Sequence, residues 1–231
     1  MAYDPYYQLV PTPKEPAFDP SRTAFIVIDL HKGCAHPEGL MGRLARDQGK
    51  PWALKERFEF VQEILPNVRR LQDSCRAAGI EVIHVRVKYL TNDCRDGARS
   101  LARETKARNT IPMDYEFMED VAPQGDEIII DKTTAGTFNS TPLESVLRNL
   151  GRDRLLFAGM VTEGCVELTA RVAADKGFFT TLVSDGCASS THLAHYDALQ
   201  RMTDGGLIVA RTSSELVSII EAARPGRAAA A

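Results

Sequence analysis

Three residues whose types together support nucleophilic catalysis each lie at or near the end of a short apolar run. Asp29 directly follows the first run, Lys132 follows the third, and Cys165 lies just beyond the fourth. A cysteine attacks as its thiolate, which requires a base to remove the proton and a nearby cation to stabilise the charge. An acid, an amine and a thiol brought together would therefore attack a carbonyl carbon and form a covalent intermediate.

Each of these residues taken alone also fits a structural role. Cysteine is among the most buried residue types, so Cys165 also fits the core of a strand–helix junction. Asp29 fits a loop cap, and Lys132 fits a solvated side chain. The three types in combination favour chemistry, because each supplies something that a nucleophilic thiol needs.

The elements that must position these residues alternate along the chain. A continuous apolar run that ends at Asp29 is typical of a strand buried on both faces. Strands that alternate with helices predict a parallel sheet covered by helices on both sides. We expect strands over 24–28, 80–87, 127–130, 154–159, 178–184 and 207–210, and helices over 58–78, 142–150, 165–176, 193–202 and 213–223. Two long polar regions, 31–54 and 89–120, are expected to be functional loops.

Ligands of open parallel sheets bind beyond the carboxyl ends of the strands. This rule places Asp29, Lys132 and the turn over 159–165 at one rim of the sheet. Because Cys165 begins the predicted helix 165–176, the backbone N–H groups and the helix dipole there are expected to lower the pKa of its thiol. The same amides could hold a developing oxyanion.

Composition excludes several classes of protein. The chain has 231 residues, 44% of them hydrophobic, and 28 Lys and Arg against 31 Asp and Glu. The near-balanced charge argues against binding to nucleic acid. No apolar run approaches the ~20 residues that span a bilayer, so we expect no membrane association. Without an apolar export segment, the five cysteines are expected to be reduced in a cytoplasmic protein.

The ends of the chain differ from its middle. Residues 1–20 contain five prolines, which exclude a helix and predict an extended arm that lies on the body or on a neighbouring subunit. The main domain is expected over 21–224. Residues 225–231 form a small-residue tail that is expected to be flexible.

Three motifs in order resemble those of the isochorismatase-like cysteine hydrolases. The first is Ala-Phe-Ile-Val-Ile-Asp-Leu at 24–30. The second is Asp-Lys at 131–132, which leads into Gly-Thr-Phe at 136–138 and Thr-Pro-Leu at 141–143. The third is Gly-Met-Val-Thr-Glu-Gly-Cys-Val-Glu at 159–167 with Thr-Ala-Arg at 169–171.

The resemblance implies a three-layer α/β/α fold, Rossmann-like, with a six-stranded parallel sheet in the order 3-2-1-4-5-6. It also implies a catalytic triad of Asp29, Lys132 and Cys165, in which the aspartate takes the thiol proton and the lysine stabilises the thiolate. A cis peptide is implied between Met160 and Val161, and an oxyanion hole from the backbone N–H groups of Val161 and Cys165. The family is further expected to need no cofactor and to form a homo-oligomer, here a tetramer, with a dimer as the second choice.

Departures from the family pattern narrow the function. The family's usual Gln-Asn-Asp-Phe is replaced by His-Lys-Gly-Cys at 31–34, so that Cys34 stands where an aromatic often walls the pocket. The segment 84–89 lacks the Asp-x-His metal cluster of the nicotinamidases, so we expect no metal site. His31, Cys34 and His36 crowd one loop and leave a transition-metal site as a weaker alternative. The retained Cys165 argues against the branch of the family that hydrolyses a vinyl ether without a nucleophilic cysteine.

The remaining branch hydrolyses small linear amides and ureides. It includes biuret and triuret hydrolases, ureidoacrylate amidohydrolases, carbamoylsarcosine amidases and maleamate amidases. Residues 127–132, the Thr162-x-x-Cys165 turn and Met202 leading to Gly205-Gly206 are most similar to biuret hydrolase. Asp204, however, replaces the glutamine that precedes the Gly-Gly pair there, which leaves a related ureide such as triuret open.

We therefore expect a cysteine-dependent amidohydrolase that releases ammonia from a small ureide through a covalent intermediate on Cys165. One alternative is a hydrolase of a carboxylated small amide of the ureidoacrylate, carbamoylsarcosine or maleamate type. A second, from a different class, is a non-catalytic member of the fold that only binds a ligand. The candidate substrate-binding residues are Cys34, Arg86, Lys88, Phe138 and Asp204.

Overall fold

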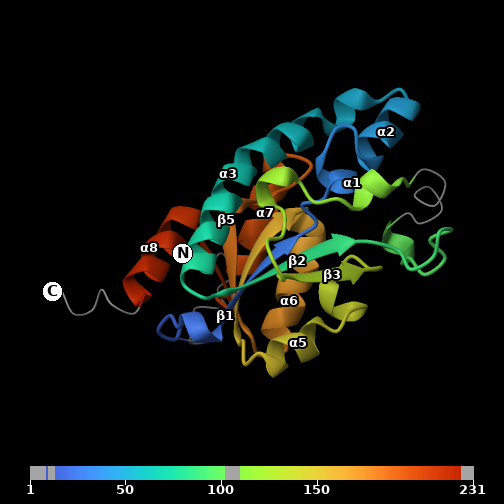
Figure 1. Cartoon of the computed structure of the whole chain (residues 1–231). Helices are drawn as coiled ribbons and strands as arrows, with labels where there is room; N and C mark the ends of the chain where they lie inside the picture. Colours follow the sequence, from blue (N-terminus) through green and yellow to red (C-terminus); the bar gives the residue numbers. More distant parts are fainter. Residues whose placement is uncertain (1–8, 10–13, 102–109, 225–231) are drawn as a thin grey trace.

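Six parallel strands form one sheet in the order β3-β2-β1-β4-β5-β6. The computed structural model describes residue 9 and residues 14–101 and 110–224 (Figure 1). The order predicted from the resemblance is confirmed. The strands are β1 (Thr23–Ile28), β2 (Glu81–Val87), β3 (Ile128–Lys132), β4 (Arg154–Met160), β5 (Phe179–Ala188) and β6 (Ile208–Arg211).

The central strand β1 is buried on both faces, as its continuous apolar sequence predicts. It pairs with β2 on one side and with β4 on the other. Phe25 and Val27 face one hydrophobic cluster, whereas Ile26 and Ile28 face a second cluster on the other side of the sheet. The carboxyl end of β1, where Asp29 follows, is therefore fixed from both sides.

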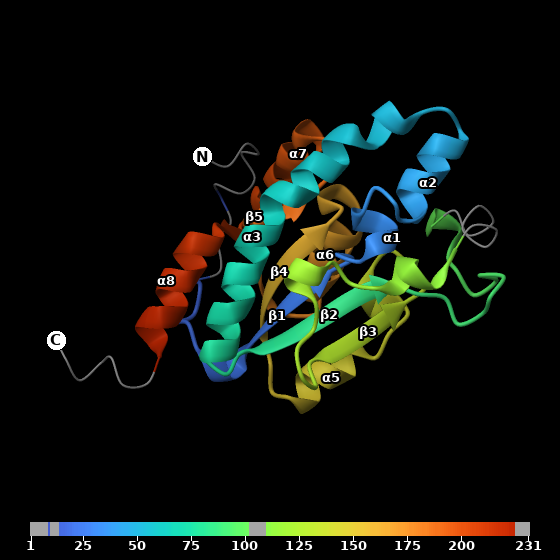
Figure 2. The same ribbon diagram turned by 45° about the horizontal axis from the view of Figure 1, so that its top comes forward.

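Helices cover both faces of the sheet. On one face, α3 and α8 lie side by side and pack against β5 (Figures 1 and 2). On the other face, α5, α6 and α7 contribute to the second cluster. The bounds of these helices are α3 (Lys55–Ala77), α5 (Leu143–Asn149), α6 (Glu167–Asp175), α7 (His192–Thr203) and α8 (Ser213–Ala223).

The region 31–54 is not the long loop expected from its polar sequence. It forms α1 (Lys32–Ala35), α2 (Leu40–Asp47) and the 3₁₀ turn η3 (Pro51–Leu54). The helical signal in α2 is short, because Leu40, Met41 and Leu44 are separated by glycine and arginine. Burial of Leu40 and packing of α2 against α1 and η3 stabilise a helix that local sequence barely specifies.

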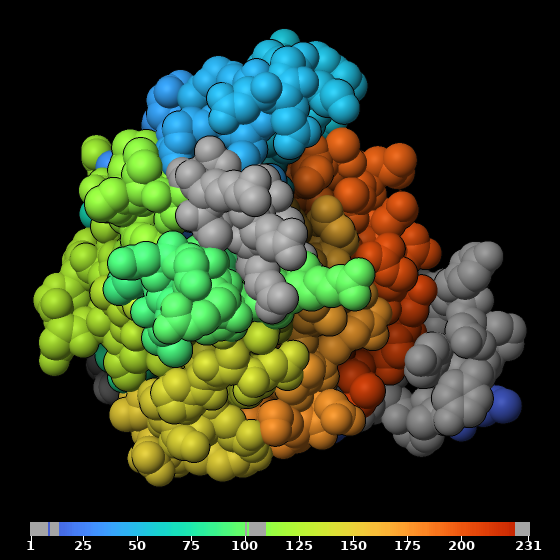
Figure 3. All heavy atoms as spheres, turned by 90° about the vertical axis from the view of Figure 1, so that its right-hand side faces the viewer, coloured from blue at the N-terminus to red at the C-terminus, as the bar shows by residue number. Residues whose placement is uncertain are grey.

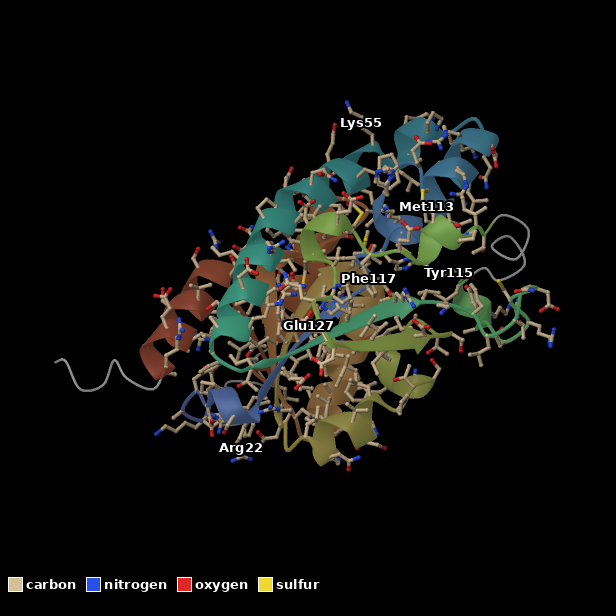
Figure 4. All side chains as sticks on the ribbon, in the orientation of Figure 1. Arg22, Lys55, Met113, Tyr115, Phe117 and Glu127 are labelled. Carbon is tan, nitrogen blue, oxygen red and sulfur yellow. The ribbon has the colours of Figure 1, made fainter. Side chains whose placement is uncertain are left out.

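The second long region contains only short 3₁₀ turns among its described residues: η4 (Arg99–Leu101), η5 (Pro112–Tyr115) and η6 (Glu119–Val121). Its later part runs back across β2, where Figure 4 labels Met113, Tyr115 and Phe117. Two backbone hydrogen bonds tie this part to the segment after β1, from Lys32 N to Glu116 O at 2.7 Å and from Met118 N to Leu30 O at 3.0 Å. The carboxyl edge of the sheet is thereby covered by both regions.

Most of the predicted arm lies outside the described residues, as does the predicted tail 225–231. Residues 14–19 have no regular secondary structure and lead into the 3₁₀ turn η2 (Pro20–Arg22). An ion pair between Glu15 and Arg211 holds them beside β6. None of the helices in the described part of the chain is long and apolar enough to cross a membrane.

Candidate active site

The three side chains singled out from the sequence meet at the carboxyl edge of the sheet. Lys132 Nζ lies 2.9 Å from Asp29 Oδ2 and donates a hydrogen bond to Cys165 Sγ at 3.3 Å. Its third contact is with the carbonyl oxygen of Thr134 at 3.1 Å. These contacts use all three donors of the ammonium, so the lysine fixes the acid and the thiol relative to each other.

Lys132 is fully buried, yet its charge is stabilised. Burial by itself lowers the pKa of the Lys132 amine, but Asp29 and Cys165 outweigh it and raise that pKa above its usual value. The site thus contains a permanent cation. A thiolate that forms on Cys165 meets this cation directly.

The expectation that the helix terminus lowers the thiol pKa is wrong for the resting site. Burial, followed by the charge of Asp29, raises the pKa of the Cys165 thiol, and the opposing effect of Lys132 is smaller. Cys165 therefore holds its proton at neutral pH until a base removes it. The neighbouring carboxylate of Asp29 is placed to be that base.

Asp29 has one oxygen bound and one oxygen free. Oδ2 contacts Lys132, whereas the buried Oδ1 has no hydrogen-bond partner among the described residues. The backbone at Asp29 has φ of +56°, a left-handed conformation that aspartate tolerates better than most residues. Its N–H donates to Val85 O at 2.8 Å, which holds the turn against β2. The free oxygen can accept a proton.

A glycine lets β4 approach the end of β1. Gly159 has φ of +120°, and a Cβ at this position would lie 1.9 Å from the carbonyl oxygen of Ile28. Any side chain here would push the two strands apart. This close approach brings the end of β4, Met160, and the following Val161 to the same cavity as Asp29.

Cys165 lies in a π-helical turn, η8 (Thr162–Val166), and the regular helix α6 begins at Glu167 rather than at Cys165. The peptide bond between Met160 and Val161 is cis. Val161 is the residue that precedes the turn, and Val161 and Cys165 both line the same cavity. The two residues expected to supply the oxyanion-hole amides thus both line the cavity.

Two threonines support the backbone at Cys165. Thr169 Oγ1 donates to the carbonyl oxygen of Cys165 at 2.6 Å and lies 3.1 Å from Thr137 Oγ1. The N–H of Thr137 also donates to Thr169 Oγ1 at 3.1 Å. This contact joins the second and third sequence motifs and explains why both threonines occur in them.

A buried histidine holds the first residue of the same turn. His195 Nδ1 lies 2.9 Å from Thr162 Oγ1, and both side chains are buried. Burial lowers the pKa of His195 to about 4, so the ring is neutral near neutral pH. The His195 ring binds a proton more readily in the unfolded chain than in the folded protein. This residue therefore destabilises the fold progressively as the pH falls from about 6.5 to about 4.

We expect the His195→Asn variant to lose less stability in acid than the native protein. Between pH 7 and pH 5 the His195 shift is expected to cost the native protein about 2 kcal/mol of unfolding free energy. Urea unfolding at the two pH values measures this difference. His192→Asn is the matched control. Glu56 and Glu63 raise the pKa of His192, so the native His192 contributes most to the stability of the fold at low pH. Equal acid sensitivity in the native and His195→Asn proteins would contradict the assignment.

A cavity of about 550 Å³ opens onto Asp29 and Cys165. Figure 3 views the molecule from the carboxyl edge of the sheet. The residues around α2 and η3, in blue, lie at the top of this face, and the residues that follow β2, in green, lie below them. The wall includes the segment after β1, α2, η3 and the start of α3. Its lining residues are Asp29, Cys34, Met41, Leu44, Ala45, Gln48, Lys50, Ala53, Leu54, Arg57, Val87, Leu101, Met160, Val161 and Cys165.

Of the five candidate substrate-binding residues, Cys34 lines this cavity and the other four are not among its described lining residues. Arg86 and Lys88 both contact Asp131, at 2.6 and 3.1 Å. Phe138 packs near Phe178, with ring centroids 6.0 Å apart. Asp204 is the C-cap residue that follows the last residue of α7.

Sequence reasoning missed the residues that line the cavity from 41 to 57. Leu54 precedes α3 and Arg57 lies in its first turn, whereas the sequence predicts a helix that starts at 58. Met41 and Leu44 lie in α2, in the region expected to be a loop. The available signal was the helical spacing of Met41, Leu44 and Ala45. No group of three or more His, Cys, Asp or Glu side chains within residues 14–101 and 110–224 is arranged to hold a metal ion.

Comparison with known proteins identifies the family. A sequence model of the isochorismatase domain matches residues 23–214, which is most of the chain. The chain belongs to the isochorismatase family. The match spans all six strands, the triad residues and the start of α8.

Relatives of this isochorismatase-family chain include enzymes named for amide hydrolysis. The chain is 28% identical over 198 residues to the ureidoacrylate amidohydrolase RutB of Serratia proteamaculans (strain 568), which covers 79% of this chain and 74% of that protein. A cysteine hydrolase structure from Pseudomonas syringae pv. phaseolicola 1448A has a TM-score of 0.77 and 25% identity, covering 90% of this chain and 97% of that chain. The N-carbamoylsarcosine amidase of Thermoplasma acidophilum shares the fold, with a TM-score of 0.63 and 19% identity over 83% of this chain and 96% of that chain.

Proposed function

We propose that this isochorismatase-family protein is a cysteine-dependent amidohydrolase. It cleaves the C–N bond of a linear carbamoyl compound that carries a carboxylate, and it releases ammonia through a covalent intermediate on Cys165. The observation that carries the proposal is the bridge that Lys132 makes between Asp29 and Cys165 at the cavity wall. The names of the relatives, an amidohydrolase and a cysteine hydrolase, support the same reaction class.

The first half of the reaction forms the covalent intermediate. Asp29 takes the proton from the Cys165 thiol, and the sulfur attacks the carbonyl carbon of the substrate. The carbonyl oxygen becomes negative and accepts hydrogen bonds from the backbone N–H groups of Val161 and Cys165, which replace those it had with water. Protonated Asp29 gives its proton to the departing nitrogen, the C–N bond breaks, and ammonia leaves.

The second half frees the enzyme. Asp29, again a carboxylate, takes a proton from a water molecule, whose oxygen attacks the same carbon. The C–S bond then breaks, and the thiolate leaves beside Lys132, the cation that stabilised it in the first half. Return of the proton from Asp29 restores the resting thiol. Only residues of the chain and water enter these steps.

A buried guanidinium favours a carboxylated substrate. Arg57 lines the cavity and is only 8% exposed. It donates from Nε and Nη2 to the carbonyl oxygen of Cys34, at 3.3 and 3.2 Å, but no carboxylate within the described residues forms an ion pair with it. A buried charge without a partner is costly, and a substrate carboxylate would supply the missing one.

Neutral ureides of the biuret or triuret type are the second candidate substrates. The likeness of residues 127–132 and of the Thr162-x-x-Cys165 turn to biuret hydrolase favours them. The residue at which this chain departs from biuret hydrolase, Asp204, is not among the described lining residues of the cavity. The cationic side chains in the lining, Arg57 and Lys50, favour the carboxylated class over a neutral ureide.

Replacing Arg57 with methionine tests this choice. We expect kcat/KM for N-carbamoylalanine to fall roughly 10- to 100-fold, since a hydrogen bond to a charged group contributes roughly 1.5–3 kcal/mol. The uncharged amide of the same compound should lose much less, and Arg57→Lys should recover part of the loss with the acid. Arg69→Met on α3, the same helix as Arg57, is the control, because Arg69 is exposed and contacts Asp73 outside the cavity. Equal losses with the acid and the amide, or a faster native reaction with biuret than with any carboxylated amide, would contradict the proposal.

A further inference from the structure

The cavity is much larger than the small ureides that the sequence suggests. A ureide of seven heavy atoms occupies at most about 200 Å³, if each atom takes the ~30 Å³ of a water molecule. The cavity volume is about 550 Å³. More than half of the space would therefore stay unfilled around such a substrate, and the chemistry of the wall indicates what fills it.

One wall of the cavity is a single face of α2. Met41, Leu44, Ala45 and Gln48 all line the cavity, and their spacing of three and four residues places them on one side of the helix. The first three of these side chains are apolar. Leu54, in the turn η3 that packs against α2, extends the same wall. An apolar stripe on a helix normally faces a protein core, but here it faces a cavity.

Ion pairs on other sides of α2 fix this orientation. Arg43 contacts the buried carboxylate of Asp114 at 2.8 Å, and Arg46 contacts Glu38 at 2.9 Å. Rotation of α2 to bury its apolar face elsewhere would break both pairs. The helix is thus held with its apolar face toward the triad.

Apolar side chains also come from other elements of the wall. Val87 at the end of β2, Leu101 in η4 and Met160 at the end of β4 line the cavity. Water in such a space would find few hydrogen-bond partners, so an apolar ligand group is the favoured occupant.

We propose that the substrates are N-carbamoyl derivatives of amino acids with large apolar side chains, such as leucine or phenylalanine. This inference rests on the proposed function and specifies its substrate class. The ureido carbonyl meets Cys165, the carboxylate meets Arg57, and the apolar side chain packs against Met41, Leu44 and Leu54. All three parts of the ligand find their partners in the lining of one cavity.

The reaction at the ureido group balances with water alone. The Cys165 sulfur bonds to the ureido carbon, the bond from that carbon to the terminal nitrogen breaks, and ammonia leaves with the proton carried by Asp29. Water then adds to the carbon, the C–S bond breaks, and the N-carboxy amino acid that is released decomposes to carbon dioxide and the amino acid. The apolar side chain contributes binding and takes no part in bond changes.

A homologous substrate series tests the inference with the native protein. N-carbamoyl derivatives of glycine, alanine, valine and leucine share the reacting group and the carboxylate and differ only in apolar size. We expect kcat/KM to rise about fourfold for each added carbon, which is about 250-fold over the four carbons that separate leucine from glycine. Equal or falling values along the series would overturn the inference.

A variant that fills the cavity tests the α2 wall itself. Ala45→Leu places a larger side chain in the space assigned to the substrate, so the preference for the leucine over the glycine derivative should fall at least tenfold. Asp47→Leu adds the same side chain on the same helix at a position outside the lining and should keep the native preference. An unchanged preference in Ala45→Leu would also overturn the inference.

Binding to the Cys165→Ala protein separates this inference from the proposed function. Calorimetry should give tighter binding of N-carbamoylleucine than of N-carbamoylglycine, whether or not the native protein hydrolyses either compound. Tighter binding of N-carbamoylleucine without hydrolysis would support the apolar specificity and refute the proposed reaction. Hydrolysis of the glycine derivative at least as fast as that of the leucine derivative would refute the specificity and keep the reaction. Absence of both binding and hydrolysis would refute the two together.

Discussion

Replacing Cys165 with alanine is expected to lower kcat by at least about 10⁴-fold, because Cys165 is the thiol that contacts Lys132 and the proposed covalent intermediate forms on it. The thermal unfolding midpoint should change little, since Cys165 is only partly buried at the cavity wall. Ammonia release in a coupled assay measures the first quantity and calorimetry the second.

Cys34→Ala is the matched control for this experiment, because Cys34 is a second thiol that lines the same cavity. The three contacts of Lys132 Nζ are with Asp29, Thr134 and Cys165, so the loss of Cys34 should lower kcat far less than the loss of Cys165. Retention of a few per cent of native activity by Cys165→Ala would contradict covalent catalysis by this residue.

The Asp29→Asn variant is expected to lose 10²- to 10⁴-fold in kcat and, at the same time, to make Cys165 more reactive toward iodoacetamide at pH 7. The two effects have one cause. The charge of Asp29 raises the pKa of the Cys165 thiol, so its removal lowers that pKa and increases the thiolate fraction. The variant therefore has a more nucleophilic thiol and no base to complete the cycle.

Lys132→Met supplies the opposite control, since the lysine charge lowers the pKa of Cys165. Alkylation of Cys165 should be slower in this variant than in the native protein. Peptide mapping of the buried Cys75 and Cys187 reports any general loosening, which would speed labelling at all positions. If Asp29→Asn alkylates more slowly at Cys165 than the native protein, Asp29 does not act as described.

The fold and the positions of the triad could be predicted from the sequence because both depend on local patterns. The apolar run before Asp29 specifies a buried strand, and parallel order brings the carboxyl ends of β1, β3 and β4 to one edge. Lys132 is the last residue of β3 rather than a residue beyond it, a difference too small to move it from that edge.

The wall of the cavity and the resting state of the thiol could not be predicted in the same way. Arg57 and Leu44 become cavity residues only through the packing of α2, η3 and α3 on one another. The pKa of Cys165 depends on how closely Asp29 approaches it and on its burial, neither of which the sequence position at a helix start reveals. Assembly as a homotetramer stays a prediction, because the arm on which it depends lies mainly outside the described residues.

The most direct test of the account is a rapid acid quench of the native protein during turnover of N-carbamoylleucine, followed by peptide mass spectrometry. A burst of ammonia stoichiometric with the protein is predicted, together with a thiocarbamate adduct on the peptide that contains Cys165, in which the sulfur carries a carbonyl group still joined to the nitrogen of leucine. An adduct on Cys34 or on another residue, or ammonia release by Cys165→Ala at the native rate, would contradict it.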